Sequence, residues 1–158
     1  MKAATVKELK NELSYLSNTD LMELVLRLSK FKKENKELLT YLLYEASNEE
    51  LYISNIKEEV KNMFSEINTS SYYFIKKSVR KILRIIKTYI RYSKKKETEV
   101  ELLLFFCNQL KNLKPSIYKN VQLLNIFKRQ IALIEKIIGT LHEDLQYDYS
   151  LEIQGLKK

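Results

Sequence analysis

The sequence predicts an all-α protein of six to seven helices, stacked as antiparallel helical hairpins in a bundle or a short α-solenoid-like array. Three observations predict this class. Apolar residues recur three and four positions apart along almost the whole chain, and strand-like alternation is absent. The breaks between apolar stretches hold Ser, Thr and Asn, which favour helix N-caps. The 158 residues include only two Gly and one Pro, so few positions interrupt a helix.

Three helices are predicted in the N-terminal third of the chain. Thr5 and Glu8 have the spacing of a capping box and open a first helix through Tyr15. A second helix follows the polar connector at residues 17–20, and a third spans about residues 34–46. Leucines three and four positions apart give each of these helices one apolar stripe.

The middle of the chain predicts three longer helices. Ser47 and Glu50 repeat the capping-box spacing and open a fourth helix through about Ile67. A fifth helix spans about residues 71–92 and a sixth about residues 98–113. The sixth is apolar almost all round, so we expect it at the centre of the packing.

The C-terminal part predicts one more helix and a loose end. Pro115 ends the sixth helix and starts a seventh, which could run to Leu145 unless Gly139 kinks or divides it. The polar residues 147–158 are expected to fray. Because no Gly/Ser-rich or Pro-rich linker is present, residues 1–146 are predicted to form a single domain.

Composition excludes several classes of function. One Cys rules out an internal disulfide, and one Cys with one His nearly rules out a four-ligand zinc site. Two glycines do not make a glycine-rich phosphate loop. His142 is the only imidazole that could activate a nucleophile, and its neighbouring carboxylates do not converge on it along a helix. We therefore predict a non-enzymatic protein with no catalytic residue, cofactor, metal or small-molecule substrate.

The sequence also predicts a cytoplasmic protein. The longest apolar run, Leu102–Cys107, is six residues long, whereas a membrane span needs about 20. The N-terminal residues lack the apolar core of a signal peptide. Cys107 is expected to stay reduced and to fill the core between apolar neighbours.

Positive charge is concentrated in one segment. Residues 70–96 hold 10 basic and no acidic side chains, whereas the whole chain has a net charge of +8. At about 100° per residue, the basic side chains of the fifth helix share a stripe beside its apolar face. The candidate partner-binding residues are Lys76, Lys77, Arg80, Arg84, Lys87, Arg91, Lys94 and Lys95.

This basic stripe predicts a surface that contacts an acidic partner. Our first hypothesis is a protein interaction domain, and the alternative is a nucleic-acid-binding protein that uses the same residues. The charged heads are about 5–6 Å apart, close to the phosphate repeat along a strand. Tyr73, Tyr89 or Tyr92 could add stacking on single strands. An anionic membrane surface also fits. Glu97, Glu99, Glu101 and the acidic fourth helix could instead neutralise the stripe within the protein. The oligomeric state is left open.

The first two predicted helices resemble the helix-turn-helix of the SAP DNA-binding module, over Thr5–Leu13 and Leu24–Leu28 within residues 5–28. The resemblance implies a DNA-binding hairpin. The chain lacks the glycine-containing turn and the basic residue that follows it, and Asp20 stands near that place. A generic amphipathic hairpin explains the pattern better.

Three stretches together are similar to a family of small helical proteins classed as a domain of unknown function. They are Val6–Leu28, then Lys77–Lys81 leading to Glu101–Phe106, and Leu141–Leu145 before a tyrosine-rich acidic end. The resemblance implies an all-helical domain that could be solenoid-like. It brings no activity, substrate or catalytic residue.

Overall fold

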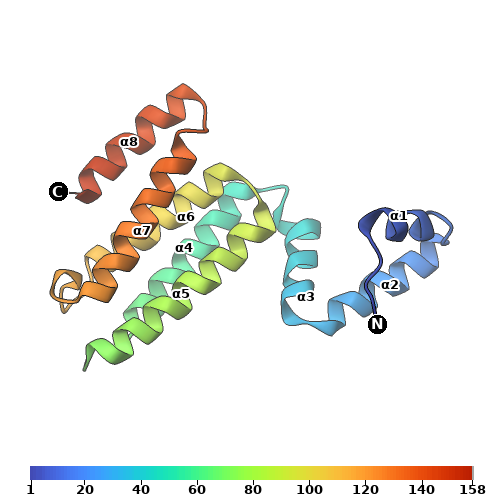
Figure 1. Cartoon of the computed structure of the whole chain (residues 1–158), viewed down its shortest axis with the longest axis horizontal. Coiled ribbons are helices and arrows are strands. Elements are labelled where there is room, and N and C mark those ends of the chain that lie inside the picture. Colours follow the sequence, from blue (N-terminus) through green and yellow to red (C-terminus); the bar gives the residue numbers. More distant parts are fainter. Residues whose placement is uncertain (158) are drawn as a thin grey trace. The chain divides into compact units, whose positions relative to one another are not determined.

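The computed structural model describes residues 1–157, and these residues are helical with no strand among them (Figure 1). The all-α class predicted from the sequence is therefore confirmed. The elements are α1 (Val6–Ser14), α2 (Asn18–Phe31), α3 (Lys33–Thr40), a π-helical turn (Tyr41–Glu45), α4 (Glu49–Ser65), α5 (Tyr72–Ser93), α6 (Lys96–Lys111), a 3-10 turn (Ile117–Lys119), α7 (Val121–Ile138) and α8 (Glu143–Lys157).

Contacts divide the chain into two compact units, residues 1–44 and residues 45–158. The first unit contains α1, α2 and α3, and the second contains α4 to α8. The expectation that residues 1–146 form a single domain stays a prediction.

The first unit is built on well-capped helices with little burial. Thr5 Oγ1 accepts a hydrogen bond from the Glu8 amide at 3.3 Å, and the Glu8 carboxylate accepts one from the Thr5 amide at 2.7 Å. This is the predicted capping box. Ser17 caps α2 in the same way, accepting from the Asp20 amide at 3.1 Å. Within residues 1–40 the only buried side chain is Ser29. Capping, more than a core, therefore defines these helices.

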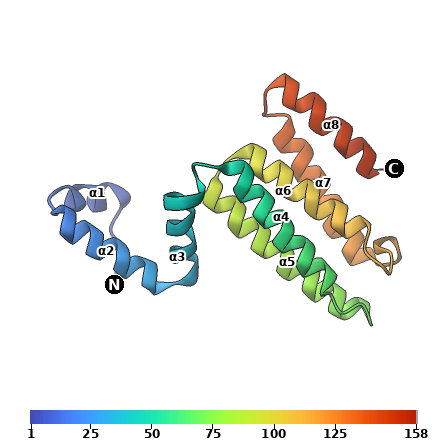
Figure 2. The ribbon, with the colours of Figure 1, turned by 180° about the vertical axis from the view of Figure 1, so that it is seen from behind.

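The second unit is organised around α6, as its all-round apolar sequence predicts. α6 contacts α4, α5, α7 and α8, and both views show it among its neighbours (Figure 1 and Figure 2). Its buried residues are Thr98, Val100, Leu102, Leu103, Leu104, Phe106, Cys107 and Leu110. Burying a side chain of this size is worth roughly 1.5–3 kcal/mol, so α6 contributes the largest share of the core.

The described residues form eight α-helices, whereas we expected six or seven. The long seventh helix ends at Ile138 and a new helix begins at Glu143, so Gly139 lies at the division that the sequence left open. α8 also runs through the segment expected to fray, up to Lys157, and Lys158 lies outside the described residues. Tyr149, Ile153 and Leu156 are buried at helical spacing, which gives this polar segment an apolar face.

The start of α4 differs by one residue from the predicted capping box. Asn48, rather than Ser47, is the N-cap, and its Oδ1 accepts a hydrogen bond from the Leu51 amide at 3.1 Å. Glu49 therefore occupies the first position of the helix, where its side chain is turned toward α5 and α6.

We predict that Cys107 does not react with thiol reagents in the folded protein. The side chain is fully buried, and burial raises the pKa of the thiol to about 12, so almost no thiolate exists at neutral pH. Reaction with Ellman's reagent at pH 8 should be at least about 100-fold slower than in guanidinium chloride, as a smaller thiolate fraction requires. Rapid labelling of the folded protein would contradict this burial.

Candidate anion-binding groove

A groove of about 700 Å³ runs between α5 and α7 on the second unit. Both helices pack against α6, and the Arg80 Nη2 donates a hydrogen bond across the groove to Gln122 Oε1 at 3.3 Å. The groove is lined by Arg80, Leu83, Arg84, Lys87, Thr88 and Arg91 from α5, and by Gln122, Asn125, Ile126 and Arg129 from α7.

The charge of the groove is entirely positive. Four of the predicted residues line it: Arg80, Arg84, Lys87 and Arg91. α7 adds Arg129, so five exposed cations border one hollow and no carboxylate does. Within residues 1–157, no carboxylate lies within ion-pair distance of any of the five. Among the described residues, the positive charge of the groove is therefore not neutralised by an ion pair.

Polar and apolar groups complete the lining. Thr88, Gln122 and Asn125 bring hydroxyl and amide groups that can donate or accept hydrogen bonds. The half-buried Leu83 and Ile126 form an apolar floor. The groove can thus hold an anionic surface that also carries some apolar area.

The contribution of α7 was missed by the sequence reasoning. Gln122, Asn125, Ile126 and Arg129 follow the i, i+3, i+4, i+7 pattern of one helix face. This stripe was visible in the sequence beside the buried stripe of α7. The sequence does not show that α7 lies next to α5. Arg129 could therefore not be assigned to the basic surface from the sequence alone.

The other predicted residues lie outside the groove. Lys76 and Lys77 line a second hollow of about 620 Å³ on α5, together with Tyr73, Arg80, Lys81 and Arg84. Lys94 is the C-cap of α5 in the left-handed conformation, with φ of 60°, and its amide donates to the Ile90 carbonyl at 2.9 Å. Lys95 forms an ion pair with Glu49 at 3.0 Å. Lys94 and Lys95 are therefore exposed at the end of α5 but do not line either hollow.

Two of the three candidate stacking tyrosines point elsewhere. Tyr92 is 8% exposed and belongs to the core. The Tyr89 hydroxyl lies 3.1 Å from both carboxylate oxygens of Glu59 on α4, which orients the ring away from the groove. Tyr73 is 66% exposed among the cations of the second hollow. Of these three tyrosines, Tyr73 alone is therefore exposed beside cations.

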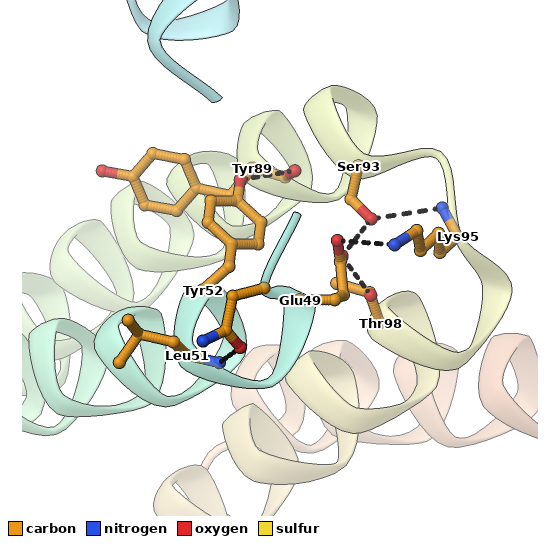
Figure 3. Close-up of polar contacts among 8 residues, drawn as sticks. Glu49, Leu51, Tyr52, Tyr89, Ser93, Lys95 and Thr98 are labelled. Carbon is orange, nitrogen blue, oxygen red and sulfur yellow. Dashed lines mark hydrogen bonds and ion pairs between the residues drawn. The ribbon is translucent and has the colours of Figure 1, made fainter. Parts of the chain in front are cut away.

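Glu49 contacts three residues around the connection between α5 and α6 (Figure 3). Its carboxylate accepts hydrogen bonds from Ser93 Oγ and, at 2.6 Å, from Thr98 Oγ1, and it also pairs with Lys95. Ser93 ends α5 and Thr98 lies in the first turn of α6, where a negative charge is favourable. One carboxylate on α4 therefore joins α4, α5 and α6 at a single point.

Glu101, another carboxylate that could neutralise the stripe, is engaged elsewhere. Glu101 pairs with Lys57 of α4 at 2.8 Å rather than with the stripe. These two residues border a further hollow of about 490 Å³ that also includes Tyr149. Burial, followed by the nearby charge of Glu101, raises the pKa of Tyr149 to about 12, so this hydroxyl stays protonated at neutral pH.

Two kinds of feature are absent from residues 1–157. No group of three or more His, Cys, Asp or Glu side chains is arranged to hold a metal ion. No helix in that range is long and apolar enough to cross a bilayer.

Comparison of the chain with protein-family models, curated proteins and solved structures gave no match. The resemblances to the SAP module and to the helical family of unknown function stay predictions.

We predict that Glu49→Ala destabilises the protein by about 2 kcal/mol, because it leaves hydrogen-bond donors from two helices without their charged acceptor. Its matched control is Glu50→Ala, which removes the exposed neighbouring carboxylate and should change stability by less than about 0.5 kcal/mol. Urea unfolding followed by circular dichroism measures both variants. Equal stability of the two would show that the Glu49 contacts do not hold these helices.

Proposed function

We propose that this protein is a non-enzymatic interaction domain that binds an acidic partner in the groove between α5 and α7. One observation carries the proposal: five exposed cations line the groove and no described carboxylate neutralises them. The bound state would replace water and counterions around these cations with the carboxylates of the partner.

The arrangement on α5 has a cost that a partner would relieve. Arg80 and Arg84 are four residues apart, Lys87 follows after three more, and Arg91 after another four. Like charges at these spacings destabilise a helix by roughly 0.2–0.5 kcal/mol per pair. An anionic partner converts these repulsions into attractions, so binding should raise the melting temperature.

An acidic protein segment suits the groove better than a nucleic acid does. The floor formed by Leu83 and Ile126 offers apolar contact that a sugar–phosphate backbone does not use. An amphipathic helix with acidic and apolar residues on one side could use both the floor and the cationic walls. Tyr89 and Tyr92 are not available for stacking on bases, which also favours a protein partner over a nucleic acid.

Nucleic acid is the second candidate because of the spacing of the cations. Arg80, Arg84, Lys87 and Arg91 follow one another at about 4.5–6 Å along the helix axis, near the repeat of phosphates on a strand. Tyr73 is exposed beside the N-terminal end of this row, where it could stack on an unpaired base.

The test measures binding of fluorescein-labelled polyglutamate, single-stranded RNA and duplex DNA by anisotropy. We expect polyglutamate to bind, and binding to weaken steeply between about 50 and 200 mM salt, because screening acts on the exposed charges. Arg84→Glu/Arg129→Glu should reduce the affinity at least about 10-fold, as reversal of two contacting charges requires.

The matched control is Lys119→Glu/Lys136→Glu, which changes the net charge equally at exposed positions outside the groove. It should bind almost as the parent protein does. Binding of nucleic acid alone, with a logarithmic salt slope of about −4.5 for five phosphate contacts, would favour the second candidate. Equal losses in both double variants, or no binding of any probe at 50 mM salt, would refute a role for the groove.

A further inference from the structure

α8 carries an acidic stripe on the side opposite its buried face. Asp144 and Asp148 are one helical turn apart and exposed, and Tyr147 and Leu151 lie beside them with exposed fractions of 68% and 51%. No cation lies on this stripe, and Lys157 of the same helix pairs with Glu135 of α7 at 2.5 Å. The outer face of α8 therefore combines carboxylates with exposed apolar side chains.

We propose that the partner of the groove is a second copy of this chain, which inserts the outer face of its α8 between α5 and α7. This inference rests on the proposed function and names the partner that it leaves open. Asp144 and Asp148 would meet arginines of the groove wall, while Tyr147 and Leu151 would contact the apolar floor. The result is a head-to-tail contact in which each copy uses two different surfaces.

The two surfaces match in sign, spacing and apolar content. Asp144 and Asp148 are separated by four residues, which is about 6 Å along a helix, and so are Arg80 and Arg84. Leu83 and Ile126 are half-buried, so they have area that Leu151 and Tyr147 could cover. An acidic helix in the groove can pair its carboxylates with the cations. Its apolar side chains can at the same time cover the apolar residues between those cations.

The occupant of the groove must come from another molecule. Tyr149, Ile153 and Leu156 hold α8 against its own core, and α8 contacts α6 and α7 of the same chain. The outer face lies on the opposite side of that helix, so it cannot turn into its own groove while α8 stays packed. The Asp144 carboxylate lies 3.5 Å from Nδ1 of His142.

The other acidic helix of the second unit is less suited to the groove. α4 intersperses its carboxylates with Lys57 and Lys61, and Lys61 lies 3.8 Å from Glu58. Glu59 accepts the Tyr89 hydroxyl, so it is engaged within the chain. These lysines would meet the cations of the groove and repel them, whereas the stripe on α8 has no such conflict.

The experiment is sedimentation velocity of the full chain over a concentration series at 100 mM salt. This salt screens the overall charge of +8 beyond about 10 Å and leaves contacts between neighbouring groups largely intact. A contact between one helix and one groove belongs to the weak class of interfaces, so we expect association at roughly 10–100 μM. A monomer throughout this range would overturn the inference.

Two variants separate the surfaces. Arg84→Glu/Arg129→Glu removes the groove, and Asp144→Lys/Asp148→Lys removes the acidic stripe. All four residues are exposed, and each variant should keep its helical circular dichroism and its melting transition. Each should be monomeric alone, because every head-to-tail contact needs one intact groove and one intact stripe.

Mixing the two variants gives the decisive result. The stripe variant still has a groove and the groove variant still has a stripe, so the mixture should associate where each variant alone does not. A mixture that remains monomeric while the parent protein associates would show that association uses other surfaces. Glu50→Lys/Glu66→Lys, on α4 and at its C-cap, makes the same change in charge as the stripe variant and should associate as the parent protein does.

Polyglutamate distinguishes the failure of this inference from that of the proposed function. If the chain self-associates through the groove, labelled polyglutamate should bind there and dissociate the assembly. If polyglutamate binds the groove while the protein is monomeric at all concentrations, the partner is a different acidic protein and only this inference fails. If neither polyglutamate nor a second copy binds, both proposals fail.

Discussion

Burial of α6 on all sides is the constraint on which the second unit depends. A helix that is apolar almost all round must be covered, and α4, α5, α7 and α8 each supply part of that cover. Each covering helix turns its apolar stripe inward, so its charged side is exposed by default. The groove between α5 and α7 is a consequence of this arrangement, because both helices use α6 as their common support.

Glu49 joins three helices at the C-terminal end of the basic stripe. Its carboxylate neutralises Lys95 and satisfies Ser93 and Thr98, which fixes the exit of α5 against the start of α4. The cations of α5 that border the two hollows have no ion pair of this kind among the described residues.

The sequence predicted features that depend on neighbours along the chain. The stripe containing Arg80 and Arg84 and the central position of α6 follow from helical periodicity, which is a local property. The role of Arg129 depends on which helices become neighbours in space. The order of residues along the chain does not specify this. The tail was misjudged for a related reason: Tyr149, Ile153 and Leu156 are separated by polar residues, so their shared face appears only on a helix.

Local charge, rather than the net charge, decides what such a protein can bind. Screening limits the reach of exposed charges to about 8–10 Å, which is shorter than the distance across a small helical domain. A partner at the groove therefore meets five cations, while a partner at the outer face of α8 meets carboxylates, although both belong to a chain with a net charge of +8. Binding of an acidic helix, including one from a second copy, is for this reason compatible with a strongly basic protein.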